Sequence, residues 1–119
     1  MEAMTTGAIL LVDARAPERF DGEVEPIDRV AGHIPGSFNY PFNLNLNSSG
    51  LFKSAREIRK GFSKLIENQA SKELVHMCGS GVTACHNIFA AELAGIMHCK
   101  LYVGSWSEWI QDPSRPVTP

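Results

Sequence analysis

The segment ELVHMCGSGVTA, residues 73–84, joins a short apolar run to a loop with two glycines and then to a helical pattern. Gly79 and Gly81 allow the backbone to curl so tightly that several N–H groups converge on one point, at which the following helix also directs the positive end of its dipole. A thiolate at that point is stabilised, and Cys78 occupies it. Open α/β sheets place their chemistry at the carboxyl ends of strands. We therefore predict that Cys78 is a nucleophile, in preference to a buried small apolar side chain.

Strand and helix patterns alternate on both sides of this segment. The predicted strands are 8–13, 38–40, 73–77 and 100–103, and the predicted helical segments are 14–20, 54–68, 82–95 and 104–109. Ser54 and Glu57 have the spacing of a capping box. Residues 112–119 hold three prolines and are predicted as an extended tail. This order predicts an α/β domain with a mostly parallel central sheet flanked by helices.

Length and composition limit the class of protein. The 119 residues suffice for one domain, 1–119, and not for two. A net charge of −2 gives no electrostatic reason to expect nucleic acid or an anionic membrane as a partner. No apolar run is long enough to span a membrane, and the first residues lack the basic start of a signal peptide. We expect an intracellular protein, cytoplasmic or alternatively mitochondrial.

The sulfur and imidazole side chains follow no metal-binding or disulfide pattern. Three cysteines are an odd number without close pairing, and the four histidines are scattered. We therefore expect no disulfide framework, no metal site and no cofactor. Cys85 and Cys99 lie in apolar helix and strand-edge surroundings, and we interpret them as structural.

Two arginines are candidates for binding an anionic substrate. Arg19 and Arg29 flank a charged, turn-rich loop, and a guanidinium holds a carboxylate through two parallel hydrogen bonds. The alternative for each is a solvated surface charge. Arg15 precedes Arg19 by four residues, so the two share a face if this stretch is helical. His33 lies in a turn rich in Gly and Pro, and we interpret its ring as locking that loop rather than as a catalytic base.

Five segments, taken in order, resemble motifs of the rhodanese family. They are VDAR at 12–15, RF at 19–20, GHIPG at 32–36, CGSGVTA at 78–84 and GSWSEW at 104–109. The resemblance spans about residues 8–113. It is strongest to the C-terminal, catalytic domain of 3-mercaptopyruvate sulfurtransferases, and it implies the rhodanese α/β fold. In that family the cysteine that matches Cys78 takes a sulfane sulfur from a donor as a persulfide. It then passes the sulfur to cyanide, a thiol or a thioredoxin-like protein.

The resemblance also implies roles for neighbouring residues. Ser80 matches a serine proposed to assist a proton relay, and Arg19 matches an arginine that holds the carboxylate and keto group of the donor. Arg29 matches a second arginine, at a shifted spacing. The loop residues that would contact donor or persulfide are Gly79, Gly81, Val82 and Thr83. The histidine and aspartate of the relay lie in the N-terminal domain of tandem members, so a further rhodanese domain or a homodimer partner could complete the cleft.

The neutral residues after Cys78 favour one donor. Relatives that use doubly charged thiosulfate carry basic residues there, whereas Gly79 and Ser80 are uncharged and favour 3-mercaptopyruvate. The alternatives are a thiosulfate sulfurtransferase, a single-domain relay that accepts persulfide from a protein, and a non-catalytic rhodanese binding module. Phosphatases of related architecture need a Cys-x5-Arg loop, and Ala84 stands where that arginine would be, which argues against this class.

Overall fold

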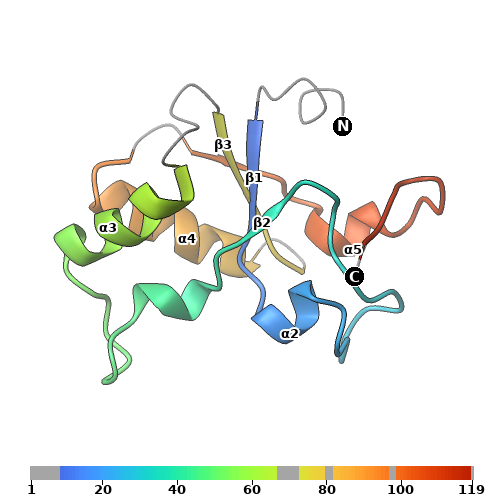
Figure 1. Ribbon diagram of the computed structural model, residues 1–119, viewed down its shortest axis with the longest axis horizontal. Coiled ribbons are helices and arrows are strands. Elements are labelled where there is room, and N and C mark those ends of the chain that lie inside the picture. The colour runs from blue at the N-terminus through green and yellow to red at the C-terminus, as the bar shows by residue number, and fades with distance from the viewer. Residues whose placement is uncertain (1–8, 67–72, 80–81, 97–98, 119) are drawn as a thin grey trace.

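A four-stranded, all-parallel sheet in the order β2-β1-β3-β4 forms the centre of the molecule (Figure 1). The computed structural model describes residues 9–66, 73–79, 82–96 and 99–118. The strands are β1 (Ile9–Asp13), β2 (Phe38–Asn39), β3 (Glu73–Met77) and β4 (Lys100–Leu101). The predicted α/β fold with a parallel sheet is confirmed.

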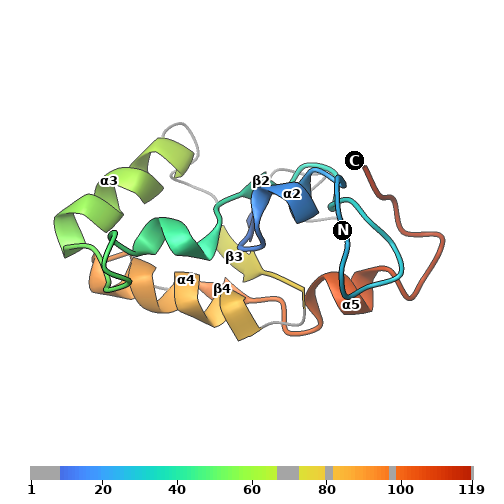
Figure 2. The ribbon, with the colours of Figure 1, turned by 90° about the horizontal axis from the view of Figure 1, so that it is seen from below.

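The sheet is covered on both faces by different helices. Helices α3 (Ala55–Ile66) and α4 (Val82–Leu93) lie on one side, and α5 (Ser105–Trp109) lies on the other (Figure 2). Alternate residues of β1 enter the two cores that result. The first core includes Leu10, Val12, Ile58, Phe62, Ala90 and Ala91, and the second includes Leu11, Ile34, Met77, Trp106 and Trp109. Burial on both faces explains why β1 is a continuous apolar run without polar alternation.

The carboxyl ends of β1 and β3 meet at one edge of the sheet. Asp13 lies opposite Met77 in the parallel register, and the N–H of Ala14 donates to the carbonyl oxygen of Met77 at 2.8 Å. Cys78 follows directly and packs with Ala14 and with Ala84 of α4 in a small buried cluster. The strand order therefore brings Cys78 beside the chain that leaves β1.

Local signals set the starts of the helices. The Ser54 hydroxyl accepts from the N–H of Glu57 at 3.2 Å, and the Glu57 carboxylate accepts from the N–H of Ser54 at 3.4 Å, so the predicted capping box opens α3. Helix α2 (Pro17–Phe20) has proline in its first turn, as expected. Arg15 precedes α2, and so the expectation that Arg15 and Arg19 share a helical face is wrong.

Two segments near the C-terminus differ from the sequence prediction. Strand β4 ends at Leu101, and the chain then turns into α5, whose first residue, Ser105, has a positive φ of 53°. The tail is not wholly extended: it turns at residues 112–115 and then pairs Thr118 with His33 through two backbone hydrogen bonds of 2.8 and 3.0 Å. Gly32 permits this approach, because a Cβ there would lie 2.6 Å from the Thr118 carbonyl oxygen. Within the described ranges, no helix has both the length and the apolar character needed to cross a bilayer.

Candidate active site

The backbone at Cys78 is held by the residues that open α5. Cys78 N–H donates to Ser105 Oγ at 3.0 Å, and the N–H of Trp106 donates to the carbonyl oxygen of Cys78 at 2.9 Å. The N–H of Ser107 donates to the carbonyl oxygen of Gly79 at 2.8 Å. These bonds fix the entry into the glycine loop from the face of the sheet opposite α4. No residue of α5 was predicted to belong to the site.

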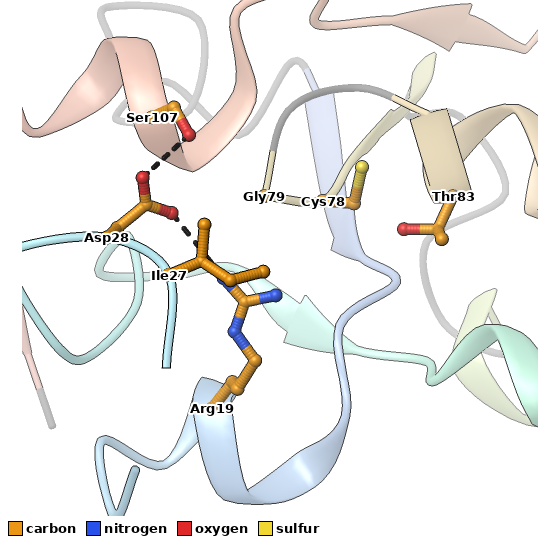
Figure 3. A pocket seen from close by; sticks show the side chains of 7 residues that line it. All are labelled: Arg19, Ile27, Asp28, Cys78, Gly79, Thr83 and Ser107. Atoms are coloured by element: carbon orange, nitrogen blue, oxygen red, sulfur yellow. Dashed lines mark hydrogen bonds and ion pairs between the residues drawn. The ribbon is translucent and has the colours of Figure 1, made fainter. Parts of the chain in front are cut away.

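A cavity of about 170 Å³ opens beside Cys78 (Figure 3). Three separate parts of the chain reach it: α2 and the loop after it, the end of β3 with the first turn of α4, and α5. The lining residues are Arg19, Ile27, Asp28, Cys78, Gly79, Thr83 and Ser107. The Cys78 residue itself is only 1% exposed. A nucleophile candidate thus lies at the wall of a small cavity that also presents one guanidinium and one carboxylate.

The guanidinium of Arg19 lies directly against Gly79. A Cβ atom at position 79 would be 3.2 Å from Nη2 of Arg19 and 3.4 Å from Nη1, which is closer than most such contacts. A glycine therefore allows the cation to lie against the backbone of the residue after Cys78.

Two carboxylates bind the same guanidinium. Arg19 Nη2 donates to Glu25 Oε2 at 3.0 Å and lies 3.4 Å from Asp28 Oδ2. The Ser107 hydroxyl donates to Asp28 Oδ1 at 2.8 Å. Neither acid was predicted as a site residue. The available signal was the pair of acids in the turn-rich loop just after Arg19.

The pKa of Glu25 lies below its usual value. Burial of the carboxyl raises the pKa, but four other interactions together outweigh it. The N–H groups of Asp28 and Ile27 donate to Oε2 at 2.8 and 3.0 Å, and the Arg19 guanidinium adds a hydrogen bond and a positive charge. Glu25 is therefore a carboxylate at neutral pH that is already engaged with backbone and arginine.

The structure brings several of the predicted site residues together. Arg19, Cys78, Gly79 and Thr83 all line the cavity. Ser80 and Gly81 lie outside the described residues, and Val82 is the first residue of α4. In the described part of the chain, no group of three or more His, Cys, Asp and Glu side chains could hold a metal ion.

Arg29 and His33 lie elsewhere. Arg29 Nη2 donates to the carbonyl oxygen of Ile110 at 2.9 Å, and the side chain lines a different cavity, beside the C-terminal tail. The ring of His33 stacks on Phe20 with centroids 3.8 Å apart, and its Nδ1 lies 2.7 Å from the carbonyl oxygen of Phe20. Because a carbonyl only accepts, Nδ1 carries the proton. His33 thus locks the loop, as interpreted from the sequence.

The other two cysteines are separate from this cavity. Cys85 is exposed on α4, which corrects the expectation of an apolar, buried setting for it. Cys99 is half-buried before β4, and burial together with the nearby Glu92 carboxylate raises the pKa of its thiol. A raised pKa makes the thiolate scarce at neutral pH and disfavours Cys99 as a nucleophile.

Comparison with known proteins gives a consistent family. Residues 1–112 match the family model described as "Rhodanese-like domain". The chain is 57% identical over 109 residues to the "Probable 3-mercaptopyruvate sulfurtransferase" of Pseudomonas aeruginosa, with 92% of this chain and 38% of that protein covered. It is 41% identical over 120 residues to the thiosulfate sulfurtransferase of Gallus gallus, with 99% of this chain and 41% of that protein covered.

A solved structure extends the comparison to three dimensions. The Tum1 protein from Saccharomyces cerevisiae matches with a TM-score of 0.80 and 30% sequence identity, over 98% of this chain and 43% of that chain. The chain therefore spans about two fifths of the length of these relatives.

Proposed function

The chain belongs to the family of rhodanese-like domains, and from this premise we propose that it transfers a sulfane sulfur through a persulfide on Cys78. The observation that carries the proposal is the cavity that Cys78 shares with Arg19, whose guanidinium lies against the next residue, Gly79. A small anionic sulfur donor requires a nucleophile and an anion-binding group in one cavity. Cys78 is the proposed nucleophile, and Arg19 is the proposed anion-binding group.

The proposed reaction has two halves. In the first, the Cys78 thiolate attacks the thiol sulfur of 3-mercaptopyruvate, so that an S–S bond forms and the C–S bond breaks. The electron pair of that bond goes to the methylene carbon, which takes up the thiol proton, and pyruvate leaves. In the second, a thiolate or cyanide attacks the outer sulfur, the S–S bond breaks, and the Cys78 thiolate returns.

The donor is proposed from the charge of the described wall. Arg19 is the one cationic residue among those that line the cavity in the described part of the chain, and Gly79 is neutral. A single guanidinium suits the single carboxylate of 3-mercaptopyruvate. Ser80 is retained as the proposed proton-relay residue, and Gly79, Gly81, Val82 and Thr83 as the proposed donor-binding part of the loop. Arg29 is withdrawn from that set, because it lines another cavity.

Partners are proposed from chemistry and length. The acceptor is a small thiol, cyanide or a thioredoxin-like protein, in a reducing compartment such as the cytoplasm. Because this chain covers 38–43% of the three relatives named above, we propose that a further rhodanese domain or a second copy completes the cleft beside Cys78.

A mass measurement tests the assignment of Cys78. After incubation with 3-mercaptopyruvate, the peptide that contains Cys78 should gain one sulfur atom, about 32 Da. The Cys78→Ser variant should lose both this gain and the formation of pyruvate. The matched control is Cys85→Ser, which removes an exposed thiol from α4 and should retain both. Pyruvate formation that persists in Cys78→Ser, or a persulfide confined to Cys85, contradicts the proposal.

The same measurement separates two kinds of sulfur transfer. A persulfide on Cys78 with continuous turnover means that the chain processes the small donor unaided. A persulfide that forms only from a protein donor favours the relay instead.

A further inference from the structure

We infer that Asp28 makes the cavity beside Cys78 selective against doubly charged sulfur donors. This inference rests on the proposed sulfur transfer and concerns the donor that the same site accepts. Asp28 lines the cavity together with Arg19 and Cys78, and its Oδ2 lies 3.4 Å from Nη2 of Arg19 (Figure 3). A donor anion that reaches this guanidinium therefore meets the Asp28 carboxylate at close range.

Asp28 is fixed in this position. The Ser107 hydroxyl donates to Oδ1 at 2.8 Å, and the backbone N–H of Asp28 donates to Glu25 Oε2 at 2.8 Å. The side chain is 12% exposed, so water screens its charge only in part. Moving the carboxylate away from the cavity would break the bond from α5. The negative charge is thus part of the resting wall of the site.

Arg19 does not reach the cavity as an uncompensated cation. It belongs to a continuous set of ion pairs that joins two arginines to three carboxylates, and the members are Arg15, Arg19, Asp13, Glu25 and Asp28. Two positive and three negative formal charges leave this set at −1. The sign of the net charge decides how donors of different charge compare, because the Coulomb energy scales with the charge of the donor. A net negative set disfavours a dianion more than it disfavours a monoanion.

The two candidate donors differ in this respect. At neutral pH 3-mercaptopyruvate carries one negative charge on its carboxylate, whereas thiosulfate carries two. The monoanion can use the directed hydrogen bonds of Arg19 while it bears a single repulsion from Asp28. Thiosulfate bears that repulsion twice. Asp28 is therefore a specificity-determining residue that lowers the use of thiosulfate relative to 3-mercaptopyruvate.

The test compares both donors in Asp28→Asn, which keeps an acceptor oxygen for Ser107 and removes the charge. The ratio of kcat/KM for thiosulfate to that for 3-mercaptopyruvate should rise about tenfold, as expected for one charge acting over a few ångströms in a partly solvated cavity. The matched control is Asp21→Asn, which removes the same charge from an exposed position outside the ion-pair set. Its donor ratio should equal that of the wild type. An unchanged ratio in Asp28→Asn, or an equal change in both variants, overturns the inference.

The wild-type protein provides a second measurement that needs no variant. If the wall is net negative, added salt screens a repulsion and raises kcat/KM for thiosulfate more than for 3-mercaptopyruvate. If added salt instead lowers kcat/KM for thiosulfate more than for 3-mercaptopyruvate, the wall is net positive and the inference is overturned.

A third measurement tests the effect of the Asp28 charge without relying on sulfur transfer. If the wild type transfers no sulfur from either donor, the proposed function fails. The rate at which iodoacetate, an anion, alkylates Cys78 relative to neutral iodoacetamide still reports the charge of the wall. This ratio should rise in Asp28→Asn and stay constant in Asp21→Asn, and a constant ratio in both contradicts a role for Asp28.

Discussion

Arg15 and Arg19 are four residues apart, yet the fold uses them in opposite ways. Arg15 is 2% exposed, and its Nη2 donates to the carboxylate of Asp13 at 2.8 Å and to the carbonyl oxygen of Gly32 at 2.7 Å. Its Nη1 has no hydrogen-bond partner in the described structure, and the ring of Trp106 lies 4.7 Å from its guanidinium carbon. Arg19 lines the cavity beside Cys78. Arg15 is therefore enclosed by protein, whereas Arg19 can be reached from a cavity.

Glu25 lies between these two arginines. Its Oε1 is 3.5 Å from Nη1 of Arg15, and its Oε2 is 3.0 Å from Nη2 of Arg19. One carboxylate therefore joins the buried pair at the end of β1 to the wall of the cavity. A substitution on the buried side, at Arg15, should therefore lower the free energy of unfolding. A substitution on the open side, at Arg19, should weaken donor binding.

The largest effect is expected on the buried side. Arg15→Met leaves the Asp13 carboxylate buried without its cation, which should lower the free energy of unfolding by about 3–5 kcal/mol. Urea unfolding measures this change. The double variant Asp13→Asn, Arg15→Met removes the orphaned charge and should recover part of the loss. A change below about 1 kcal/mol in Arg15→Met would show that water reaches the pair and that the contrast with Arg19 is wrong.

His76 is fully buried like Arg15, but its ring is not hydrogen-bonded. Neither of its ring nitrogens has a hydrogen-bond partner in the described structure. Burial lowers the pKa of His76 from 6.5 to about 4. Between these pH values the unfolded chain takes up a proton that the folded chain does not, so stability is complete above pH 6.5 and is lost as the pH falls toward 4.

The loss should reach about 3 kcal/mol at the acid end of this window. The measurement is the unfolding free energy of wild type and His76→Leu at each pH, since their difference cancels the other titrating groups. A difference that does not change between pH 7 and 4 would contradict a neutral, buried His76.

A smaller effect is expected on the open side. Arg19→Ala removes the guanidinium from the cavity and leaves Glu25 and Asp28 without it, so KM for 3-mercaptopyruvate should rise by the equivalent of about 1.5–3 kcal/mol. Steady-state kinetics measure this rise. Arg19→Lys keeps the charge without the two-pronged geometry and should fall between wild type and alanine. An unchanged KM in both variants would contradict donor binding by Arg19 and favour the alternative that Arg19 is only a surface charge.

Gly79→Ala should produce the smallest effect. The added methyl group would lie 3.2 Å from Nη2 of Arg19, and the guanidinium must retreat by a few tenths of an ångström. Because the end of a flexible side chain can move, we expect a rise in KM below about 1 kcal/mol, without loss of stability. The double variant that combines Arg19→Ala with Gly79→Ala tests the cause. If its KM equals that of Arg19→Ala alone, the added methyl group acts through Arg19. Additive rises would show that it acts on the donor or loop directly.

The sequence alone predicted the order of strands and helices and indicated Cys78 as the candidate nucleophile. The apolar runs of β1 and β3, the capping box of α3 and the glycines after Cys78 are local signals, readable within a few residues. The cysteine at the end of β3 followed from the same pattern. The charged loop after Arg19 made Arg19 and Arg29 the two candidates for binding an anion, and family resemblance favoured Arg19.

The surroundings of Cys78 depend on contacts between distant parts of the chain. The bond from Cys78 to Ser105 joins residues 27 apart, and the bond from Ser107 to Asp28 joins residues 79 apart. The fold likewise buries Arg15, places Arg29 at another cavity and brings Asp28 to the wall of the cavity beside Cys78. The reason is physical: hydrophobic periodicity and turn preferences act between near neighbours, whereas charge compensation depends on distances set by packing across the whole sheet.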